Sequence, residues 1–155
     1  MKKNIFIDGE TGTTGLQVRE KLIKHPNVNI MPVDQFKRKE ISYKKEMLAQ
    51  SDVTFLCLPD ESSLETVKIA NELGDKSPII IDSSTVHRTN PNWAYGLPEL
   101  GKDYRKKIEN SKRIASPGCY PTGANVILKP LISKGILSQN IPIIINAVSG
   151  YSGGG

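Results

Sequence analysis

Short apolar runs alternate with amphipathic segments along most of the chain. Residues 3–8 form an apolar run that ends at Gly9, and residues 14–24 then place apolar side chains at helical spacing. His25-Pro26 ends this helix, because proline cannot continue a helix and restricts the residue before it. The N-terminal segment therefore predicts a strand, a glycine turn and a helix.

Three further strands follow from the same pattern. We expect them at residues 28–33, 52–59 and 78–82. The last two are apolar on both faces, which is typical of strands buried in a parallel sheet. Residues 41–50, between the first two of these strands, predict a polar helix.

Two more helices are indicated by the residues at their ends. Ser62 with Glu65 three residues later matches a capping box, and Gly74 lies where that helix would end. A second helix is expected from Pro121 to Gly135. Its apolar side chains share one face: Ala124, Ile127, Leu128, Leu131 and Ile132.

This order of elements predicts an α/β fold built on a Rossmann-like parallel sheet with right-handed crossovers. Ligands bind such sheets beyond the carboxyl ends of the strands. A last strand is expected at residues 141–148, and it leads directly into the glycine-rich segment 149–155. Because a domain rarely finishes there, we expect the chain to be truncated.

Composition narrows the class of protein. The 155 residues suit one ordinary domain, and 37% apolar with 24% charged residues indicates a globular chain. The net charge is +5, and the basic residues cluster mainly at 37–39, 44–45 and 105–107. No aromatic residues interleave these clusters and no zinc-finger spacing occurs, so nucleic-acid binding is the weakest interpretation.

The sequence has no apolar run of membrane-spanning length and only two cysteines, Cys57 and Cys119. Their contexts differ, so no disulfide framework is implied and a cytoplasmic location is expected. No metal-ligand cluster is visible, and no metal is expected.

Residues 9–15 follow the first strand and open a helix, as a dinucleotide-binding loop does. Glycines allow a tight turn and close backbone approach, and the helix N-terminus presents N–H groups to a pyrophosphate. The spacing G-x-x-G-x-x-G is not the commonest one, so a purely structural turn is the alternative. The candidate cofactor-binding residues are Gly9, Thr11, Gly12, Thr13, Thr14 and Gly15.

The residues after the second strand bear on the choice between NAD and NADP. A basic residue there accommodates a 2'-phosphate, and an acidic one holds a free 2'-hydroxyl. Lys37 and Arg38, followed by Lys39, favour NADP, whereas Asp34 argues against it. A solvated charge run is an equal alternative.

Cys119 is the candidate nucleophile. It lies just ahead of the helix expected to begin near Pro121, where the positive end of the helix dipole favours a thiolate. Gly118 permits close approach of a substrate, and neighbouring N–H groups could form an oxyanion hole. Cys57 lies inside an apolar run and is interpreted as a core residue.

A thiolate nucleophile generally needs an acid/base partner. His25 is interpreted as a surface residue at a helix end, and the spacing does not place His87 beside Cys119. Arg88 could bind a phosphate or carboxylate of the substrate, with a surface salt bridge as the alternative.

Five segments together resemble the short-form N-acetyl-gamma-glutamyl-phosphate reductases over nearly the whole chain. They are IFIDGETGTTGLQVREKL, DVTFLCLPD, IIDSSTVHRTNPNWAYGLPEL, SPGCYPTGA and NAVSGYSGGG. The GCYPTGA and WAYGLPEL stretches are far more specific than a glycine loop. Aspartate-semialdehyde dehydrogenase, which shares the cysteine-thioester and NADP chemistry, is the nearest alternative.

The resemblance implies an NADPH-dependent reduction of an acyl phosphate through a thioester on Cys119, in arginine biosynthesis. It assigns residues 1–117 to an NADP-binding domain and 118–155 to the beginning of an α+β catalytic and dimerisation domain, in a homo-oligomer when full length. It implies that the nicotinamide side is lined by Ser83, Ser84 and Pro121, and that the substrate is bordered by Ser149, Gly150, Ser152 and Gly153.

One departure concerns length. Family members are about twice as long, and their catalytic histidine lies beyond the position of Gly155, so neither His25 nor His87 matches it. We therefore expect this chain to be inactive alone. The alternative that is not an enzyme is a catalytically inactive dinucleotide-binding module.

Overall fold

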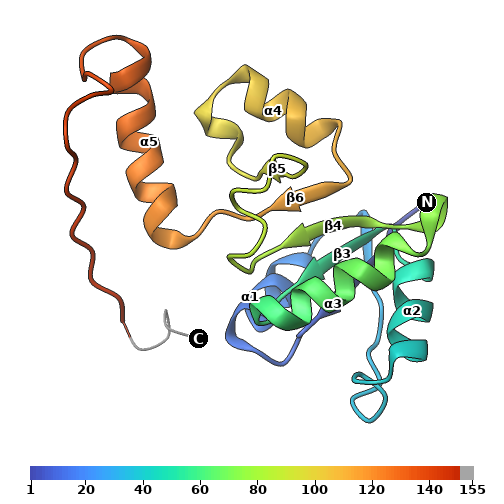
Figure 1. Cartoon of the computed structure of the whole chain (residues 1–155). Coiled ribbons are helices and arrows are strands. Elements are labelled where there is room, and N and C mark those ends of the chain that lie inside the picture. The colour runs from blue at the N-terminus through green and yellow to red at the C-terminus, as the bar shows by residue number, and fades with distance from the viewer. Residues whose placement is uncertain (151–155) are drawn as a thin grey trace.

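The computed structural model describes residues 1–150 and contains one six-stranded parallel sheet (Figure 1). Across the sheet the strands are ordered β2-β1-β3-β4-β6-β5. This confirms the expected Rossmann-like parallel sheet. The strands are β1 (Lys3–Asp8), β2 (Val28–Ile30), β3 (Val53–Leu56), β4 (Ile79–Asp82), β5 (Ala94–Tyr95) and β6 (Arg113–Ala115).

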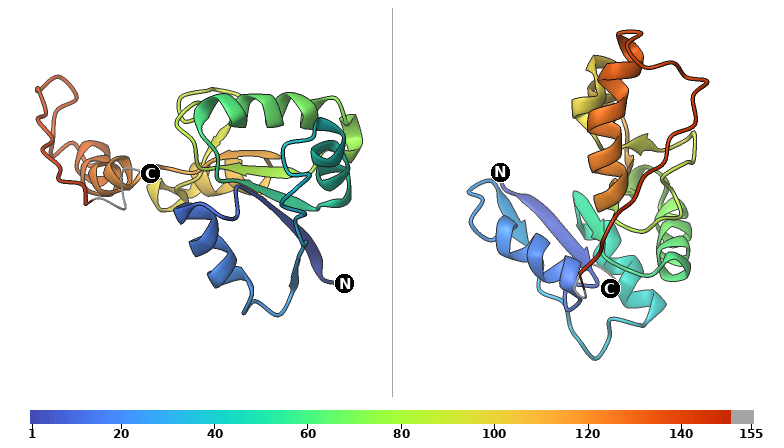
Figure 2. Two further views of the ribbon diagram at one scale, coloured as in Figure 1. Left: turned by 90° about the horizontal axis from the view of Figure 1, so that it is seen from below. Right: turned by 90° about the vertical axis from the view of Figure 1, so that its left-hand side faces the viewer.

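Helices cover both faces of this sheet. Figure 2 shows α1 on one face and α2 and α3 together on the other. None of the helices within the described residues combines the length and apolar character that a membrane crossing requires. The helices are α1 (Thr13–Leu22), α2 (Ile41–Gln50), α3 (Asp60–Asn71), α4 (Lys102–Glu109) and α5 (Cys119–Ser133), with short 3-10 turns η1 (Gly74–Lys76) and η2 (Pro98–Leu100).

The order of strands reverses at β1. The chain leaves β1 for β2 on one side and returns to β3 on the other, so that Ile5 is paired with both Ile30 and Val53. A crevice opens at such a switch point beyond the carboxyl ends of the two central strands. The loops after β1 and β3 therefore meet at the edge where ligands bind parallel sheets.

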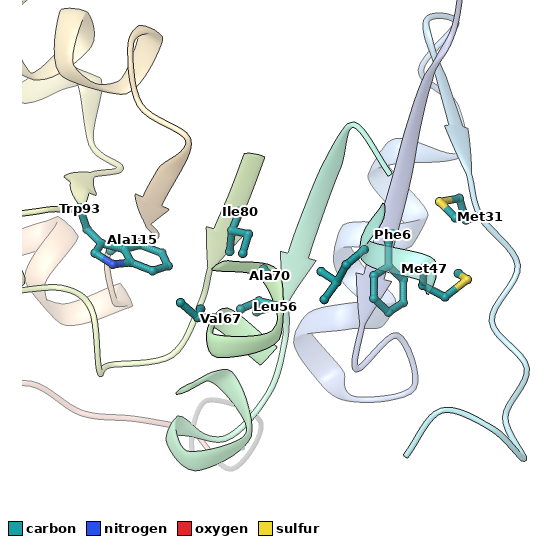
Figure 3. Close-up of a cluster of buried hydrophobic side chains, with 10 residues drawn as sticks. Phe6, Met31, Met47, Leu56, Val67, Ala70, Ile80, Trp93 and Ala115 are labelled. Carbon is teal, nitrogen blue, oxygen red and sulfur yellow. The ribbon is translucent and has the colours of Figure 1, made fainter. Parts of the chain in front are cut away.

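The hydrophobic core lies between the sheet and the α2–α3 face (Figure 3). Phe6 projects from β1 toward Met47 of α2, while Leu56 and Ile80 continue this layer across β3 and β4. Burial of such side chains contributes about 1.5–3 kcal/mol each. The core thus fixes the strands whose carboxyl ends carry the loops discussed below.

The expected capping box at Ser62 is wrong. The N-cap of α3 is Pro59, three residues earlier, so the helix begins at Asp60 and Ser62 lies inside it. The acidic pair Asp60 and Glu61 occupies the first turn, where negative charge is favoured by the helix dipole. Ser63, one residue after the expected cap, is fully buried and donates a hydrogen bond to Asp82.

The end of α5 agrees with the sequence pattern. Gly135 has a φ of 68°, and its N–H bonds to Ile132 while the N–H of Ile136 reaches Leu131. This is the hydrogen-bond pattern of a Schellman cap, which favours glycine.

The strand expected at residues 141–148 is absent from the structure. That segment is extended and exposed, with 86% of Ile144 and 97% of Val148 in solvent. An apolar run becomes a strand only when a neighbouring strand supplies hydrogen bonds. Within residues 1–150 no strand lies beside it. Figure 1 shows the chain turning after α5 and running back along the length of this helix, at one end of the molecule.

Candidate functional site

The loop after β1, residues 9–15 (the glycine loop), contains three glycines with different surroundings. Gly9 has a φ of 90°, and a β-carbon there would lie 2.2 Å from the carbonyl oxygen of Cys57. A β-carbon on Gly15 would lie 2.1 Å from the carbonyl oxygen of Gly9. Gly9 is therefore required by the turn against β3, and Gly15 by the close packing of α1 on the loop.

Neither the backbone conformation nor the packing around Gly12 requires glycine at this position. Its φ is −77°, and a β-carbon would meet only the Gly9 carbonyl oxygen at 3.5 Å, an ordinary contact. The space in front of Gly12 is thus open. Thr13 and Thr14 follow as the exposed first residues of α1, and the N–H groups of a first helical turn have no partner within the helix.

A cavity of about 410 Å³ lies beside this loop, over the carboxyl ends of β1, β2 and β3. It is bounded by the end of β1, the glycine loop, the loops after β2 and β3, and the helices α2 and α3. Both apolar and charged side chains line it. Among them are Glu10, Thr11, Gln35, Arg38, Lys39 and Leu58.

The loop after β2, residues 34–40 (the basic loop), contains both Asp34 and the basic run, and their side chains have different surroundings. Asp34 accepts a hydrogen bond from the N–H of Phe36 and does not line the cavity. Arg38 lines it and donates to the Thr11 hydroxyl at 3.2 Å. Lys39 also lines the cavity, whereas Lys37 does not.

A buried ion pair at the cavity wall was missed by sequence reasoning. Lys44 Nζ lies 3.0 Å from Asp8 Oδ2 and 3.0 Å from the Thr66 hydroxyl. Removing one partner of such a pair would leave a buried charge uncompensated. The pair ties α2 and α3 to the end of β1. Its only sequence signal was an aspartate ending an otherwise apolar strand.

The carboxyl end of β4 is organised around Asp82, a carboxylate with no solvent exposure. Its oxygens accept hydrogen bonds from the Ser63 hydroxyl and from the N–H and hydroxyl of Ser84. The hydroxyl of Ser83 donates to Leu56 at the end of β3. The N–H groups and hydroxyls of both serines thus donate to the ends of β3 and β4, which fixes the start of the loop after β4.

Cys119 is exposed and is the first residue of α5. The helix begins two residues earlier than expected, so Pro121 lies in its first turn and Gly118 is the N-cap. The carbonyl oxygen of Gly118 accepts hydrogen bonds from the N–H and hydroxyl of Thr122. The N–H groups of Cys119 and Tyr120 belong to the first turn, so they have no partner within the helix.

Cys57 has a different environment. It follows β3, it is partly buried, and burial raises the pKa of its thiol to about 11. A thiol in this state is a poor nucleophile at neutral pH. This supports the interpretation of Cys57 as a packing residue.

Arg88 bridges β4 and the segment that leads to Cys119. It donates to the carbonyl oxygens of Ser83 at 3.0 Å and Ser116 at 3.2 Å. It forms no salt bridge within the described residues. Arg88 therefore holds the start of α5 against the sheet, with part of its guanidinium beside Gly118.

Neither histidine contacts Cys119 by a hydrogen bond within the described residues. His87 is 6% exposed, and its ring stacks on Trp93 at 3.8 Å between centroids. Burial lowers the pKa of His87, against an opposing effect of Asp82. His25 accepts a hydrogen bond from the N–H of Asn27 at the end of α1.

Two of the four residues that we expect to border the substrate lie within the part of the chain that the structure describes. Ser149 and Gly150 are exposed, and no hydrogen bond joins them to Cys119 or Arg88 within residues 1–150. Ser152 and Gly153 lie outside the described residues.

Comparison with solved structures supports the fold. The structure of aspartate semialdehyde dehydrogenase from Francisella tularensis covers 87% of this chain at a TM-score of 0.65 and 17% identity, and 42% of that chain is matched. The enzyme from Candida albicans, solved with NADP, covers 86% at a TM-score of 0.63 and 17% identity, with 48% of that chain matched.

Comparison with curated protein sequences identifies nearer relatives than the comparison with solved structures. N-acetyl-gamma-glutamyl-phosphate reductases from Brucella ovis and Brucella canis are 44% identical over all 155 residues. The chain spans about half the length of these curated relatives, 49% in both cases.

Two family models match successive parts of the chain. Residues 4–111 match the NAD binding domain of semialdehyde dehydrogenases, and residues 119–155 match their dimerisation domain. The first match alone covers more than half of the sequence. The chain therefore belongs to the semialdehyde dehydrogenase family.

Proposed function

We propose that this chain carries the NADP site and the nucleophile of an enzyme that reduces N-acetyl-gamma-glutamyl phosphate to N-acetylglutamate semialdehyde, a step of arginine biosynthesis. The observation that carries the proposal is Cys119, an exposed thiol at the first residue of α5. The 44% identity over all 155 residues of this chain to a reductase of that name supports the choice of substrate.

The glycine loop and the cavity fit a dinucleotide. Gly9 makes the turn, Gly15 allows α1 to pack on it, and Gly12 leaves open the space that a pyrophosphate needs. Arg38 and Lys39 supply positive charge at the cavity, where a 2'-phosphate would lie. Bound NADPH would supply the hydride for the reduction.

Cys119 would act first, as a thiolate that attacks the acyl carbon of the substrate. The bond from that carbon to the phosphate oxygen breaks, phosphate leaves, and a thioester on the sulfur remains. After reduction, the carbon–sulfur bond breaks, the aldehyde departs and the thiolate is restored. The first-turn N–H groups of Cys119 and Tyr120 would stabilise negative charge on the acyl oxygen in both steps.

Proton transfer is assigned to neither histidine of this chain. His87 is enclosed by Trp93 and Asp82, and His25 lies at the far end of α1. By the family resemblance, the acid/base histidine belongs to the part of the relatives that this chain does not span. The match of residues 119–155 to a dimerisation domain supports a homo-oligomer.

The first half-reaction can be tested without the cofactor. The chain is incubated with N-acetyl-gamma-glutamyl phosphate, and phosphate release and intact protein mass are followed. We expect stoichiometric phosphate and an N-acetylglutamyl adduct that is absent in Cys119→Ser and retained in Cys57→Ser. Failure to acylate, in a chain that binds NADPH, would favour an inactive dinucleotide-binding module.

The complete reaction is tested by joining this chain to the second half of the Brucella ovis relative. We expect phosphate-dependent NADP reduction with N-acetylglutamate semialdehyde, abolished by Cys119→Ser. Aspartate semialdehyde serves as the competing substrate. Faster turnover of aspartate semialdehyde would contradict the proposed substrate while leaving the cysteine chemistry in place.

A further inference from the structure

The basic loop is attached to the glycine loop by two side-chain hydrogen bonds. Gln35 Nε2 donates to Glu10 Oε1 at 2.9 Å, and Arg38 Nη1 donates to the Thr11 hydroxyl at 3.2 Å. The acceptors are consecutive residues of the glycine loop, and the donors are three residues apart in the basic loop. The two loops therefore act as one wall of the cavity.

The basic loop also has its own internal support. Two successive turns close it, with Lys37 N–H bonded to Asp34 and Glu40 N–H bonded to Lys37. At its base, the N–H of Asp34 donates to the hydroxyl of Tyr43 in α2. The base of the loop is fixed by α2, and the side chains of Gln35 and Arg38 join its middle to the glycine loop.

Glu10 needs an explanation, because a carboxylate in a phosphate-binding loop repels its ligand. Its second oxygen accepts a charge-assisted hydrogen bond from Arg19 of α1 at 3.1 Å, and only 15% of the side chain is exposed. Arg19 thus compensates the charge, and the carboxylate remains as the acceptor for Gln35. Glu10 joins α1 to the basic loop.

We propose that Glu10 and Gln35 are positioning residues that set the preference for a 2'-phosphorylated cofactor. They hold the basic loop so that Arg38, bonded to Thr11 through Nη1, stays in the lining of the cavity. This inference rests on the proposed function, because it assumes that the cavity takes the adenosine end of NADP. Neither residue has to touch the ligand.

The proposal predicts that changes at Glu10 or Gln35 weaken the preference for a 2'-phosphate but have little effect on binding of the rest of the nucleotide. Adenosine 2',5'-bisphosphate and adenosine 5'-monophosphate differ only in the 2'-phosphate, so the ratio of their affinities isolates the effect of that group. Gln35→Glu places two carboxylates against each other and should lower the ratio about fivefold, as expected from one lost hydrogen bond. Arg38→Ala should lower it about 30-fold, since a charged contact is lost.

The matched control is Gln50→Glu. Gln50 Nε2 donates to Glu46 Oε1 at 3.0 Å on the exposed surface of α2, so this change has the same chemistry and charge away from the cavity. Glu10→Gln keeps an oxygen acceptor for Gln35 and should retain the ratio within about twofold, whereas Glu10→Ala should not. Calorimetric titration of the full chain gives both affinities, and urea unfolding verifies each fold.

The outcomes separate the two proposals. If the native chain does not distinguish the two nucleotides, the proposed cofactor is wrong. If it does, and Arg38→Ala abolishes the distinction while Gln35→Glu behaves like Gln50→Glu, the positioning role of Glu10 and Gln35 is overturned. An equal loss of both affinities in Gln35→Glu would likewise overturn it, since a general structural role predicts that result.

Discussion

The guanidinium of Arg88 lies against Gly118, the residue that precedes Cys119. A β-carbon on Gly118 would come within 2.6 Å of Arg88 Nη1. Because Gly118 has an ordinary extended backbone, with φ of −75°, the need for glycine comes from this contact and not from strain. Arg88 thereby links the end of β4 to the N-cap of α5.

Gly118→Ala should displace Arg88 and weaken its hydrogen bonds to Ser83 and Ser116. We expect a loss of about 1–3 kcal/mol in the free energy of unfolding, measured in urea. Arg88→Met should cost a similar amount. Because both changes break the same contact, the double variant should be far less destabilised than the sum. Strict additivity would show that Gly118 and Arg88 act independently.

The three glycines of the glycine loop should respond differently to alanine. Gly12→Ala should leave thermal unfolding nearly unchanged and weaken NADPH binding tenfold or more, by about 1.4 kcal/mol per factor of ten. Gly15→Ala should lower the unfolding temperature, because its β-carbon meets backbone atoms at 2.1 Å. A Gly12→Ala protein that binds NADPH normally would contradict a pyrophosphate at this loop.

The two thiols should differ in reactivity. At pH 8 we expect iodoacetamide to modify exposed Cys119 well before Cys57, whose pKa of about 11 leaves almost no thiolate. Peptide mass spectrometry over time distinguishes the sites. In urea the two rates should converge, since unfolding removes the burial that protects Cys57. Faster labelling of Cys57 in the folded chain would contradict its assigned environment.

Acid should destabilise the chain through His87. Burial holds the pKa of folded His87 below the unfolded value of 6.5, so the unfolded state binds the proton more readily. The stabilisation is complete above pH 6.5 and is lost as pH falls through the folded pKa. His87→Phe keeps an aromatic ring on Trp93 without a titrating group, so its urea midpoint should fall less between pH 7 and pH 5.

The same fall in both proteins would show that the carboxylates alone cause the acid sensitivity. A steeper fall in His87→Phe would contradict the direction of the pKa shift.

The sequence pattern was sufficient to predict the central strands, because buried strands are marked by runs of apolar residues. Strands β1, β3 and β4 are apolar runs, and the glycine loop and Gly135 carry the local signals of a tight turn and a helix cap. Placement of Cys119 at a helix N-terminus followed from Gly118 and Pro121, although the helix begins two residues earlier than expected.

Other elements leave little trace in the sequence. Helix α4 has no buried residue, and β5 has two residues held by pairing with β6, so neither shows the apolar period that identifies an element. The ion pair of Asp8 and Lys44 joins residues 36 positions apart, and the contact of Glu10 with Gln35 spans 25. Only the three-dimensional arrangement brings such partners together.

The exposed segment 141–148 has a practical consequence for work with this polypeptide. Ile143, Ile144 and Ile145 form a β-prone run whose backbone N–H and C=O groups have no hydrogen-bond partner within residues 1–150 and can pair with another strand. Two copies that meet edge to edge satisfy those groups and bury the isoleucines together. Aggregation should therefore rise steeply with concentration, and dilute, cold handling will set the conditions under which the chemistry of Cys119 can be observed.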